Sequence, residues 1–388
     1  MTLPRFLMIC ALLLAIPSRT QAEPLPELHR GLNLSSWLAN APRQPVFARD
    51  FAQIKRVGFD HVRLPFNPEY VGFALTPHSN TTPPIDFISL DRAIAMAEQY
   101  DLPVVLDLHP GGPFMETLEH HVWAENSFVN LWTIIAERYK DHDSSHLIFE
   151  LLNEPQYYRS EALWNKLAAR TVNAIHAISP DRVLIVGAPH GSEIDALAFL
   201  QPINDPRVIY AFHFYEPYLV THQGIHMGFE KKMIRSFRNM PYPSSRATES
   251  ALLYAPTAPD PREAQAELQD YKTAPWDAAH IKARIDIARD WADLHHVHLV
   301  CGEFGVLRNH IDQESRYSWI KDARSAMDAD GIGWEIWDYS DLFGIAPPTH
   351  PSAPDPVDGS VRLSDPDHGS RAFEPEALAA LGLSEGSP

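Results

Sequence analysis

The chain has 388 residues, of which 45% are hydrophobic and 21% are charged. This length suits one large α/β barrel or two average domains, and the composition excludes a globally disordered protein. Fifty acidic residues outnumber 32 lysines and arginines, which gives a formal net charge of −18. Because such an excess of acid repels phosphate backbones and anionic lipids, we expect neither nucleic acid nor a membrane surface as a partner.

The N-terminus has the pattern of an export signal. Arg5 precedes an apolar run from Phe6 to Ile16, and Ala22 closes a candidate cleavage site. The apolar run spans roughly 11 residues, whereas a membrane-crossing helix needs roughly 20. We therefore expect a signal peptide over residues 1–22 and a secreted or periplasmic protein with no membrane insertion after its removal. A buried N-terminal helix is the alternative interpretation.

Short apolar runs with the composition of buried strands alternate with longer amphipathic segments of helical spacing. The predicted strands are Gly31–Trp37, His61–Phe66, Val104–His109, Leu147–Leu152, Val183–Val186, Val208–Phe214, His298–Cys301 and Gly333–Trp337. The predicted helices are Phe47–Val57, Leu90–Gln99, Phe128–Tyr139, Ala162–Ile178, a shorter segment at Glu193–Leu200, Ile281–Leu294, Tyr317–Ala329 and Phe373–Leu383.

This alternation predicts βα units and a parallel sheet. Eight such units in a chain of this length indicate an α/β protein with a (β/α)8 TIM barrel and enlarged βα loops, in one domain over residues 23–388. The rival fold is an open doubly wound sheet, which usually carries a glycine-rich phosphate turn after its first strand. Leu34-Ser35-Ser36-Trp37 is not such a turn, so we expect the barrel.

Two stretches interrupt the repeat of strands and helices. A long insertion over about residues 218–275 follows the sixth strand, and a Pro-rich segment over about residues 346–370 follows the eighth. Both would leave the barrel at its C-terminal face, where barrel enzymes build their sites. We expect a cleft wall or lid there, and a decorative insertion is the alternative.

Polar and aromatic side chains gather where six of the predicted strands end, and in a barrel these ends converge on one bowl. Glu154 follows the fourth strand and Glu303 the seventh, so they would face each other. Paired carboxyl groups suit cleavage of a glycosidic bond, because one protonates the leaving oxygen while the other, ionised, attacks the anomeric carbon. Arg63, at the second strand, would hold one of them ionised.

These motifs, in their order along the chain, resemble glycoside hydrolase family 5, the cellulase-like branch of the retaining (β/α)8 glycosidases. The resemblance covers nearly the whole chain after residue 22, and its most specific motif is Leu152-Asn153-Glu154-Pro155. The other matching segments are Arg30–Asn33, Gly58–Pro65, Leu108-His109, His213–Tyr215, Gly302–Gly305 and Trp334–Trp337.

The resemblance implies a role for each matching position. Glu154 would be the general acid/base and Glu303 the nucleophile, while Asn153 would bind the 2-hydroxyl of the sugar being cleaved. Arg63 and Tyr215 would contact and orient the nucleophile. The residues that line the subsite beside the scissile bond would be His109 and His213, with Trp337 as an aromatic floor under the sugar.

The implied reaction is hydrolysis of β-linked glucan by double displacement with retention. We expect an endo-β-1,4-glucanase that acts as a monomer on a polysaccharide or oligosaccharide, without a cofactor or metal. Exo- or endo-β-1,3-glucanase and β-mannanase activities are alternatives, because the loops at Gly112–Asn126 and Tyr218–Pro275 would decide among them. Outside this class stand a non-catalytic glycan-binding barrel and a metal-dependent barrel hydrolase.

Several other residues invite a functional interpretation. His120-His121 and His295-His296-Val297-His298 suggest metal ligands, but a metal site also needs a converging carboxylate or third histidine. The second run precedes the seventh strand, at the bottom of the barrel, so we expect solvated or helix-end histidines. Cys301 lies two residues before Glu303, so it is expected to point into the barrel one layer deeper, as core filler. Four aromatic residues are candidate outer sugar platforms, with ordinary packing an equal interpretation: Trp37, Trp123, Trp276 and Tyr218.

Overall fold

The computed structural model describes residues 25–39, 46–75, 77, 85–225, 232–247, 261–347 and 371–386. The expected signal peptide, most of the Pro-rich segment and parts of the insertion lie outside the described residues. Within the described ranges, no helix combines the length and the apolar character that crossing a bilayer requires.

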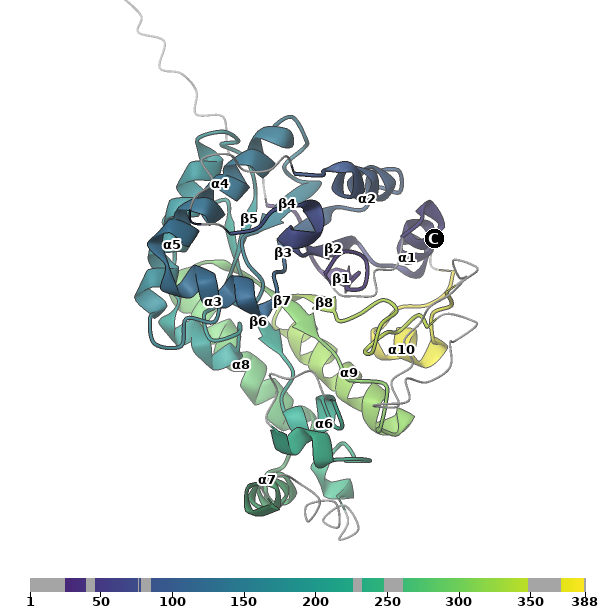
Figure 1. Ribbon diagram of the computed structural model, residues 1–388. Helices are drawn as coiled ribbons and strands as arrows, with labels where there is room; N and C mark the ends of the chain where they lie inside the picture. Colours follow the sequence, from purple (N-terminus) through teal and green to yellow (C-terminus); the bar gives the residue numbers. More distant parts are fainter. Residues whose placement is uncertain are drawn as a thin grey trace, which may run out of the picture.

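Eight parallel strands close into a barrel in chain order, with β1 paired to both β2 and β8 (Figure 1). The predicted (β/α)8 barrel is therefore confirmed. The strands are β1 Arg30–Asn33, β2 His61–Phe66, β3 Val104–Leu108, β4 Leu147–Glu150, β5 Leu184–Gly187, β6 Val208–Phe214, β7 His298–Phe304 and β8 Gly333–Ile336.

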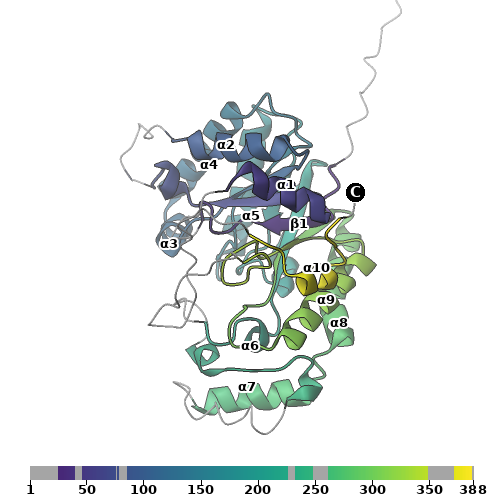
Figure 2. The ribbon, with the colours of Figure 1, turned by 90° about the vertical axis from the view of Figure 1, so that its right-hand side faces the viewer.

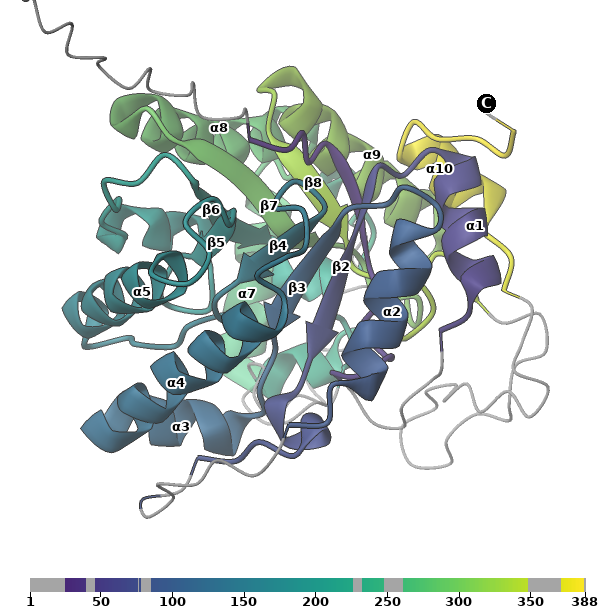
Figure 3. The ribbon, with the colours of Figure 1, turned by 90° about the horizontal axis from the view of Figure 1, so that it is seen from above.

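The helices flank the strands, as the view from above shows (Figure 3). Each buries one apolar stripe; α1 at Ala48–Val57, for example, buries Phe51, Ile54 and Val57. The other barrel helices are α2 Ile88–Glu98, α3 Gly112–His120, α4 Val122–Arg138, α5 Glu161–His176, α8 Ala278–His295, α9 Gln313–Ala329 and α10 Pro375–Ala380.

Three connections differ from the sequence expectation. Residues Gly112–Asn126, expected as a loop, contain α3 and the start of α4. The connection between β5 and β6 holds a 3₁₀ helix, Ile194–Phe199, in place of an α-helix. The insertion contains helices of its own, and α7 lies beyond α6, away from the barrel (Figure 2). These are α6 Tyr218–Thr221, the 3₁₀ helices Lys232–Ser236 and Ser244–Arg246, and α7 Pro261–Thr273.

The barrel interior has an apolar zone and a charged zone. Val105 and Ile148 belong to an apolar cluster that also draws on β5, β6 and β7. Two residues further along the same strands, Asp107 and Glu150 replace them, and both are buried. Because side chains alternate along a strand, these carboxyl groups point inward above the apolar cluster. The site at the C-terminal ends of the strands therefore rests on buried charge.

Strand β7 carries an irregularity next to the site. Phe212 pairs with Cys301, but His213 pairs with Glu303, so one residue of β7 is skipped. The pairing with β8 shifts over the same stretch. Such a bulge resets the side-chain alternation. Cys301 is fully buried, but it belongs to the cluster between strands and helices, whereas Val300 belongs to the interior cluster. The expectation that Cys301 points into the barrel is wrong.

Candidate active site

Glu154 and Glu303 meet at the C-terminal ends of β4 and β7. One oxygen of each carboxyl group and one ring nitrogen of His213 all lie within 4.8 Å of one another. The Glu303 side chain is 5% exposed, whereas that of Glu154 is 37% exposed. The pair thus consists of one enclosed carboxyl group and one that is open to a ligand.

The backbone at Glu154 is held in an unusual conformation. Its φ of 45° lies in the left-handed region, which non-glycine residues seldom adopt. The backbone N–H of the neighbouring Asn153 donates to the Leu108 carbonyl at 2.9 Å. The side-chain amide of Gln156 donates to the backbone carbonyl of Glu154 at 2.9 Å. Local strain of this kind persists where the surroundings fix it, and it concentrates at functional sites.

Glu303 accepts a hydrogen bond on each carboxyl oxygen. Arg63 Nη1 donates to Oε1 at 2.8 Å, and the Tyr215 hydroxyl donates to Oε2 at 2.9 Å. Burial raises the pKa of Glu303, and the positive charge of Arg63 opposes that rise. Both hydrogen bonds favour the ionised carboxylate. Glu303 is therefore the carboxyl group suited to carry a negative charge.

Glu154 is in a different electrostatic setting. Its side-chain partner is His213, whose Nδ1 lies 3.0 Å from Oε1. Although this side chain is partly exposed, the protein around it removes enough water to raise the pKa of Glu154 above the ordinary 4.5, and the charge of Arg63 opposes the rise. Neither Arg63 nor Tyr215 donates a hydrogen bond to this group. It is the carboxyl group suited to hold a proton.

Arg63 is fully buried and connects Glu303 to the rest of the barrel. Burial disfavours its charge, but the surrounding carboxylates outweigh that effect and keep its pKa well above the usual value. The planar guanidinium matches carboxylate geometry, so it fixes the positions of its partners. Besides Glu303, these are Glu150 at 2.7 and 3.0 Å, Asp107 at 2.9 Å, Asn33 at 2.9 Å and Asn153 at 3.0 Å.

His109 and Asn153 form the side of the site beside Trp337. His109 Nδ1 lies 2.9 Å from Asp107 and its Nε2 lies 3.2 Å from Asn153 Nδ2. Burial lowers the pKa of His109 to about 4, so the ring is neutral at pH 7, with its proton on Nδ1. Asn153 then uses one amide hydrogen on His109 and keeps the other for a ligand hydroxyl. The rings of His109 and Trp337 are stacked, with their centroids 5.5 Å apart.

His213 lies between the two glutamates. Its Nδ1 is 3.0 Å from Glu154 and 3.6 Å from Glu303. Burial lowers the pKa of His213 to about 4. These three side chains are also the group that would reach a single metal ion, since their ligand atoms lie so close together. The same proximity is what a two-carboxyl mechanism requires.

The structure thus brings together all eight candidate residues. The structure also contains a buried polar network that the motifs did not single out as a site. In this network, His61 Nε2 lies 3.0 Å from a carboxyl oxygen of Glu335, and His61 Nδ1 lies 2.5 Å from one of Asp60. Burial alone would lower the pKa of His61, but these two carboxylates raise it to about 9. The remaining network members are Asn33, Asp107 and Glu150. No local signal in the sequence marked these residues as a network, because each is a single polar residue between two apolar neighbours.

Comparisons with known proteins identify the family of this chain. Endoglucanase C of Acetivibrio thermocellus is 29% identical over 80% of this chain and 91% of its own length. Cellodextrinase A of Ruminococcus flavefaciens is 28% identical over 79% of this chain and 84% of its own length.

Among solved structures, the cellulose synthase subunit Z of Clostridioides difficile is 27% identical, with a TM-score of 0.66 over 91% of this chain and 99% of that one. Thermotoga maritima Cel5A shares the fold at 22% identity, with a TM-score of 0.68 over 92% and 97% of the two chains. The model of the cellulase family matches residues 27–342, which is most of the chain. The chain therefore belongs to the cellulase family, glycosyl hydrolase family 5, and is a glycoside hydrolase.

Proposed function

We propose that this protein is a retaining endo-β-1,4-glucanase with Glu154 as general acid/base and Glu303 as nucleophile. The observation that carries the proposal is the close approach of these carboxyl groups, with oxygens within 4.8 Å. Retaining glycosidases hold their two carboxyl groups about 5–5.5 Å apart, whereas inverting enzymes leave about 6.5–9.5 Å for a water molecule. The short separation supports direct attack by a carboxylate.

In the first step, Glu303 attacks the anomeric carbon and Glu154 gives its proton to the departing glycosidic oxygen. In the second step, Glu154 takes a proton from water, and the water oxygen displaces Glu303 from the anomeric carbon. The hydrogen bonds from Arg63 and Tyr215 favour the ionised nucleophile before the first step and after the second. The raised pKa of Glu154 supports its role as a proton donor.

The free amide hydrogen of Asn153 and the stacked ring of Trp337 supply the sugar contacts. Asn153 donates to the 2-hydroxyl, and Trp337 packs against the C–H face of the same ring. His109 and His213 complete this subsite as neutral groups. The β-1,4-glucan substrate is supported by relatives named as endoglucanases and as a cellodextrinase.

Reducing-end release tests the proposal on carboxymethylcellulose, mixed-linkage β-glucan, laminarin, glucomannan and cellodextrins. We expect activity on the cellulosic and mixed-linkage substrates, with retained anomeric configuration by proton NMR. Activity on laminarin or glucomannan alone would keep the mechanism and replace the substrate. Inverted products would contradict the double displacement.

Two variants test the assignments. Glu303→Ala should abolish hydrolysis, and azide should convert an activated cellobioside to a glycosyl azide without restoring hydrolysis by water. Glu154→Gln should lose activity on the polysaccharides of the panel. A Glu303→Ala enzyme that keeps most of its activity would refute the nucleophile. Inhibition of the wild type by a chelator would instead favour a metal-dependent hydrolase.

We propose further that the protein is exported as a monomer, with residues 1–22 removed and residues 23–388 as one catalytic domain. The support is the apolar run Phe6–Ile16 ahead of Ala22. N-terminal sequencing of the protein from culture fluid and periplasm, with light scattering for its mass, tests these points. A mature N-terminus at Met1 would contradict processing.

A further inference from the structure

Two exposed tyrosines stand close to the acid/base. Tyr158 follows Glu154 by four residues and is 53% exposed, and Tyr218 follows β6 and is 37% exposed. The negative charge of Glu154 contributes to raising the pKa of both phenols, after burial, so both rings lie near that carboxyl group. Each tyrosine ring packs against a histidine ring. The ring centroids of Tyr158 and His190 lie 5.0 Å apart in a stacked arrangement, and those of Tyr218 and His222 lie 5.1 Å apart.

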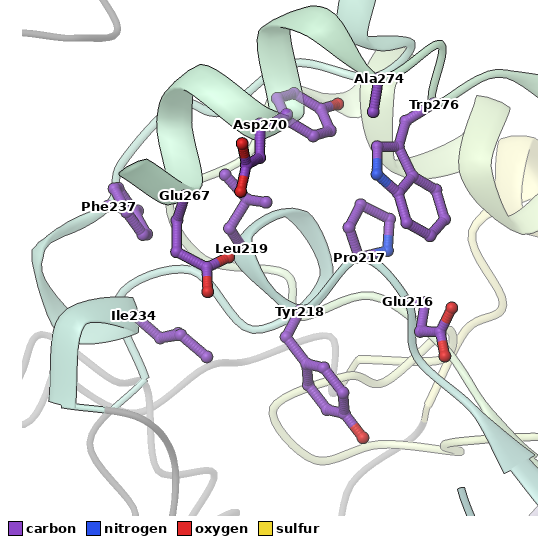
Figure 4. A pocket seen from close by; sticks show the side chains of 11 residues that line it. Glu216, Pro217, Tyr218, Leu219, Ile234, Phe237, Glu267, Asp270, Ala274 and Trp276 are labelled. Atoms are coloured by element: carbon purple, nitrogen blue, oxygen red, sulfur yellow. The ribbon is translucent and has the colours of Figure 1, made fainter. Parts of the chain in front are cut away.

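Tyr218 also lines a pocket formed by the insertion. The pocket has a volume of about 220 Å³, and its wall runs from the residues after β6 to α7 and the segment that follows (Figure 4). Trp276 lies beside Pro217 in the wall, and the carboxyl groups of Glu267 and Asp270 extend from α7 (Figure 4). Since drug-sized ligands occupy about 300–1,000 Å³, this pocket suits roughly one sugar unit.

We propose that Tyr218 and this pocket bind a sugar unit of the glucan on the leaving-group side of the scissile bond. The inference rests on the proposed function, because it takes Glu154 as the proton donor. The departing sugar must lie next to the group that protonates its oxygen. The ring of Tyr218 packs on His222, and His222 packs on Tyr215, which donates to Glu303. Tyr218 also lines the pocket together with Trp276, so a chain that leaves the catalytic centre can contact Tyr218 and enter the pocket.

The lining has the chemistry that a neutral sugar needs. The aromatic faces of Tyr218 and Trp276 match the C–H faces of a pyranose, and carboxylates accept its hydroxyl protons. Glu216 is held in place by Arg284, whose Nε and Nη2 lie 2.7 and 2.8 Å from its oxygens.

The test compares two substrates that differ on the leaving-group side. Cellopentaose places sugars on both sides of the scissile bond, whereas 2,4-dinitrophenyl β-cellobioside places none on the leaving side and needs no protonation. For Tyr218→Ala and Trp276→Ala, we expect the ratio of kcat/KM for cellopentaose to kcat/KM for the aryl cellobioside to fall roughly tenfold, as the loss of an aromatic contact implies. Tyr218→Phe keeps the ring and should hold the ratio within about threefold of the wild type.

Leu294→Ala is the control for unspecific effects. Leu294 is 74% exposed on α8, near the start of β7 and at the far end of the barrel, so both rates should stay at wild-type values. An unchanged ratio in Tyr218→Ala and Trp276→Ala would overturn the leaving-side subsite, and so would a parallel fall of both rates. A wild-type enzyme that cleaves the aryl cellobioside but not cellopentaose would overturn the proposed endoglucanase itself.

Discussion

At the scale of single residues, the two catalytic candidates differ in the hydrogen-bond donors around them. Glu303 accepts one hydrogen bond from Arg63 and one from Tyr215, and Glu154 has His213 as its side-chain partner. Burial raises the pKa of both carboxyl groups. The donors on Glu303 are therefore what separates an ionised group from a protonated one.

Replacing Tyr215 by phenylalanine removes one donor from Glu303. A hydrogen bond to a charged group contributes about 1.5–3 kcal/mol, so we expect kcat to fall by roughly ten- to a hundredfold. Because the lost bond favoured the ionised form, the pKa of Glu303 should rise, and the acid limb of kcat/KM should move to higher pH. Initial rates on an aryl cellobioside across a pH series measure both effects. An unmoved acid limb would contradict this role for Tyr215.

On cellopentaose, whose leaving group needs a proton, the alkaline limb of kcat/KM should report Glu154. The acid/base must be protonated in the free enzyme, so kcat/KM should fall as pH rises through its pKa, which burial holds above 4.5. With an aryl leaving group that needs no protonation, Glu154→Gln should still form the glycosyl-enzyme, and the wild type should lack this alkaline limb. A burst of dinitrophenol in stopped flow monitors that step. An alkaline limb that persists on the aryl substrate would assign it to another group.

At this scale the sequence predicted the residues of the candidate site better than the buried carboxylates that surround Arg63 beneath it. The eight candidate residues lie in motifs at strand ends, where residue type and position together predict a role. Asp107, Glu150 and Glu335 are single acidic residues inside strands, and a buried carboxylate there has no local signature. Only the barrel register shows that they surround Arg63.

At the scale of elements, the bulge in β7 decides which side chains enter the site. Strict alternation would place Cys301 and Glu303 on the same side, and the skipped residue separates them. A bulge depends on pairing with both neighbouring strands, so it could not be predicted from β7 alone. The helices α3 and α7 were missed because their apolar stripes are short and lie within Pro-rich or polar surroundings.

The approach of β7 to β8 gives a second prediction at this scale. A Cβ atom on Gly305 would lie 2.2 Å from the backbone oxygen of Trp337, so alanine there must displace the segment that carries the aromatic floor. We expect Gly305→Ala to raise KM for cellodextrins and to lower Tm, since overpacking costs about 1–3 kcal/mol. Gly112→Ala is the matched control, because no atom lies within 4 Å of its added Cβ. Equal KM values in the two variants would refute the displacement.

At the scale of the whole molecule, the barrel interior carries a charged zone that responds to pH. The folded protein raises the pKa of His61 from 6.5 to about 9. Its stabilising contribution is therefore complete below pH 6.5 and is lost as pH rises through about 9. Burial also raises the pKa of Asp107 to about 7, which acts in the same direction at lower pH.

We therefore expect the Tm of the wild type to fall between pH 7 and pH 9.5. His61→Gln should have a lower Tm at pH 7, because Asp60 and Glu335 lose a cationic partner. Its Tm should also depend less on pH across this window. Differential scanning calorimetry at constant ionic strength measures both. A variant whose Tm falls as steeply as that of the wild type would show that other groups control the alkaline loss of stability.

The architecture itself was predictable because each of the eight βα units has a local signal. Apolar runs mark buried strands, helical spacing marks the covering helices, and the chain order of the barrel follows from that alternation. The connection from β5 to β6 was the weakest prediction, and it is the one that lacks an α-helix. The insertion could not be predicted, because its shape depends on contacts with the barrel.

Arg63 gives this architecture an evolutionary consequence. One guanidinium joins residues from β1, β2, β3, β4 and β7, so the side chain that contacts the proposed nucleophile also ties more than half of the barrel together. Removing one partner of a buried ion pair costs about 3–5 kcal/mol, a large fraction of the stability of an ordinary protein. Selection would reject most changes at the centre before catalysis is ever tested. New substrate preferences must then arise at the rim, where Tyr158, Tyr218 and Trp276 can change without loosening the strands.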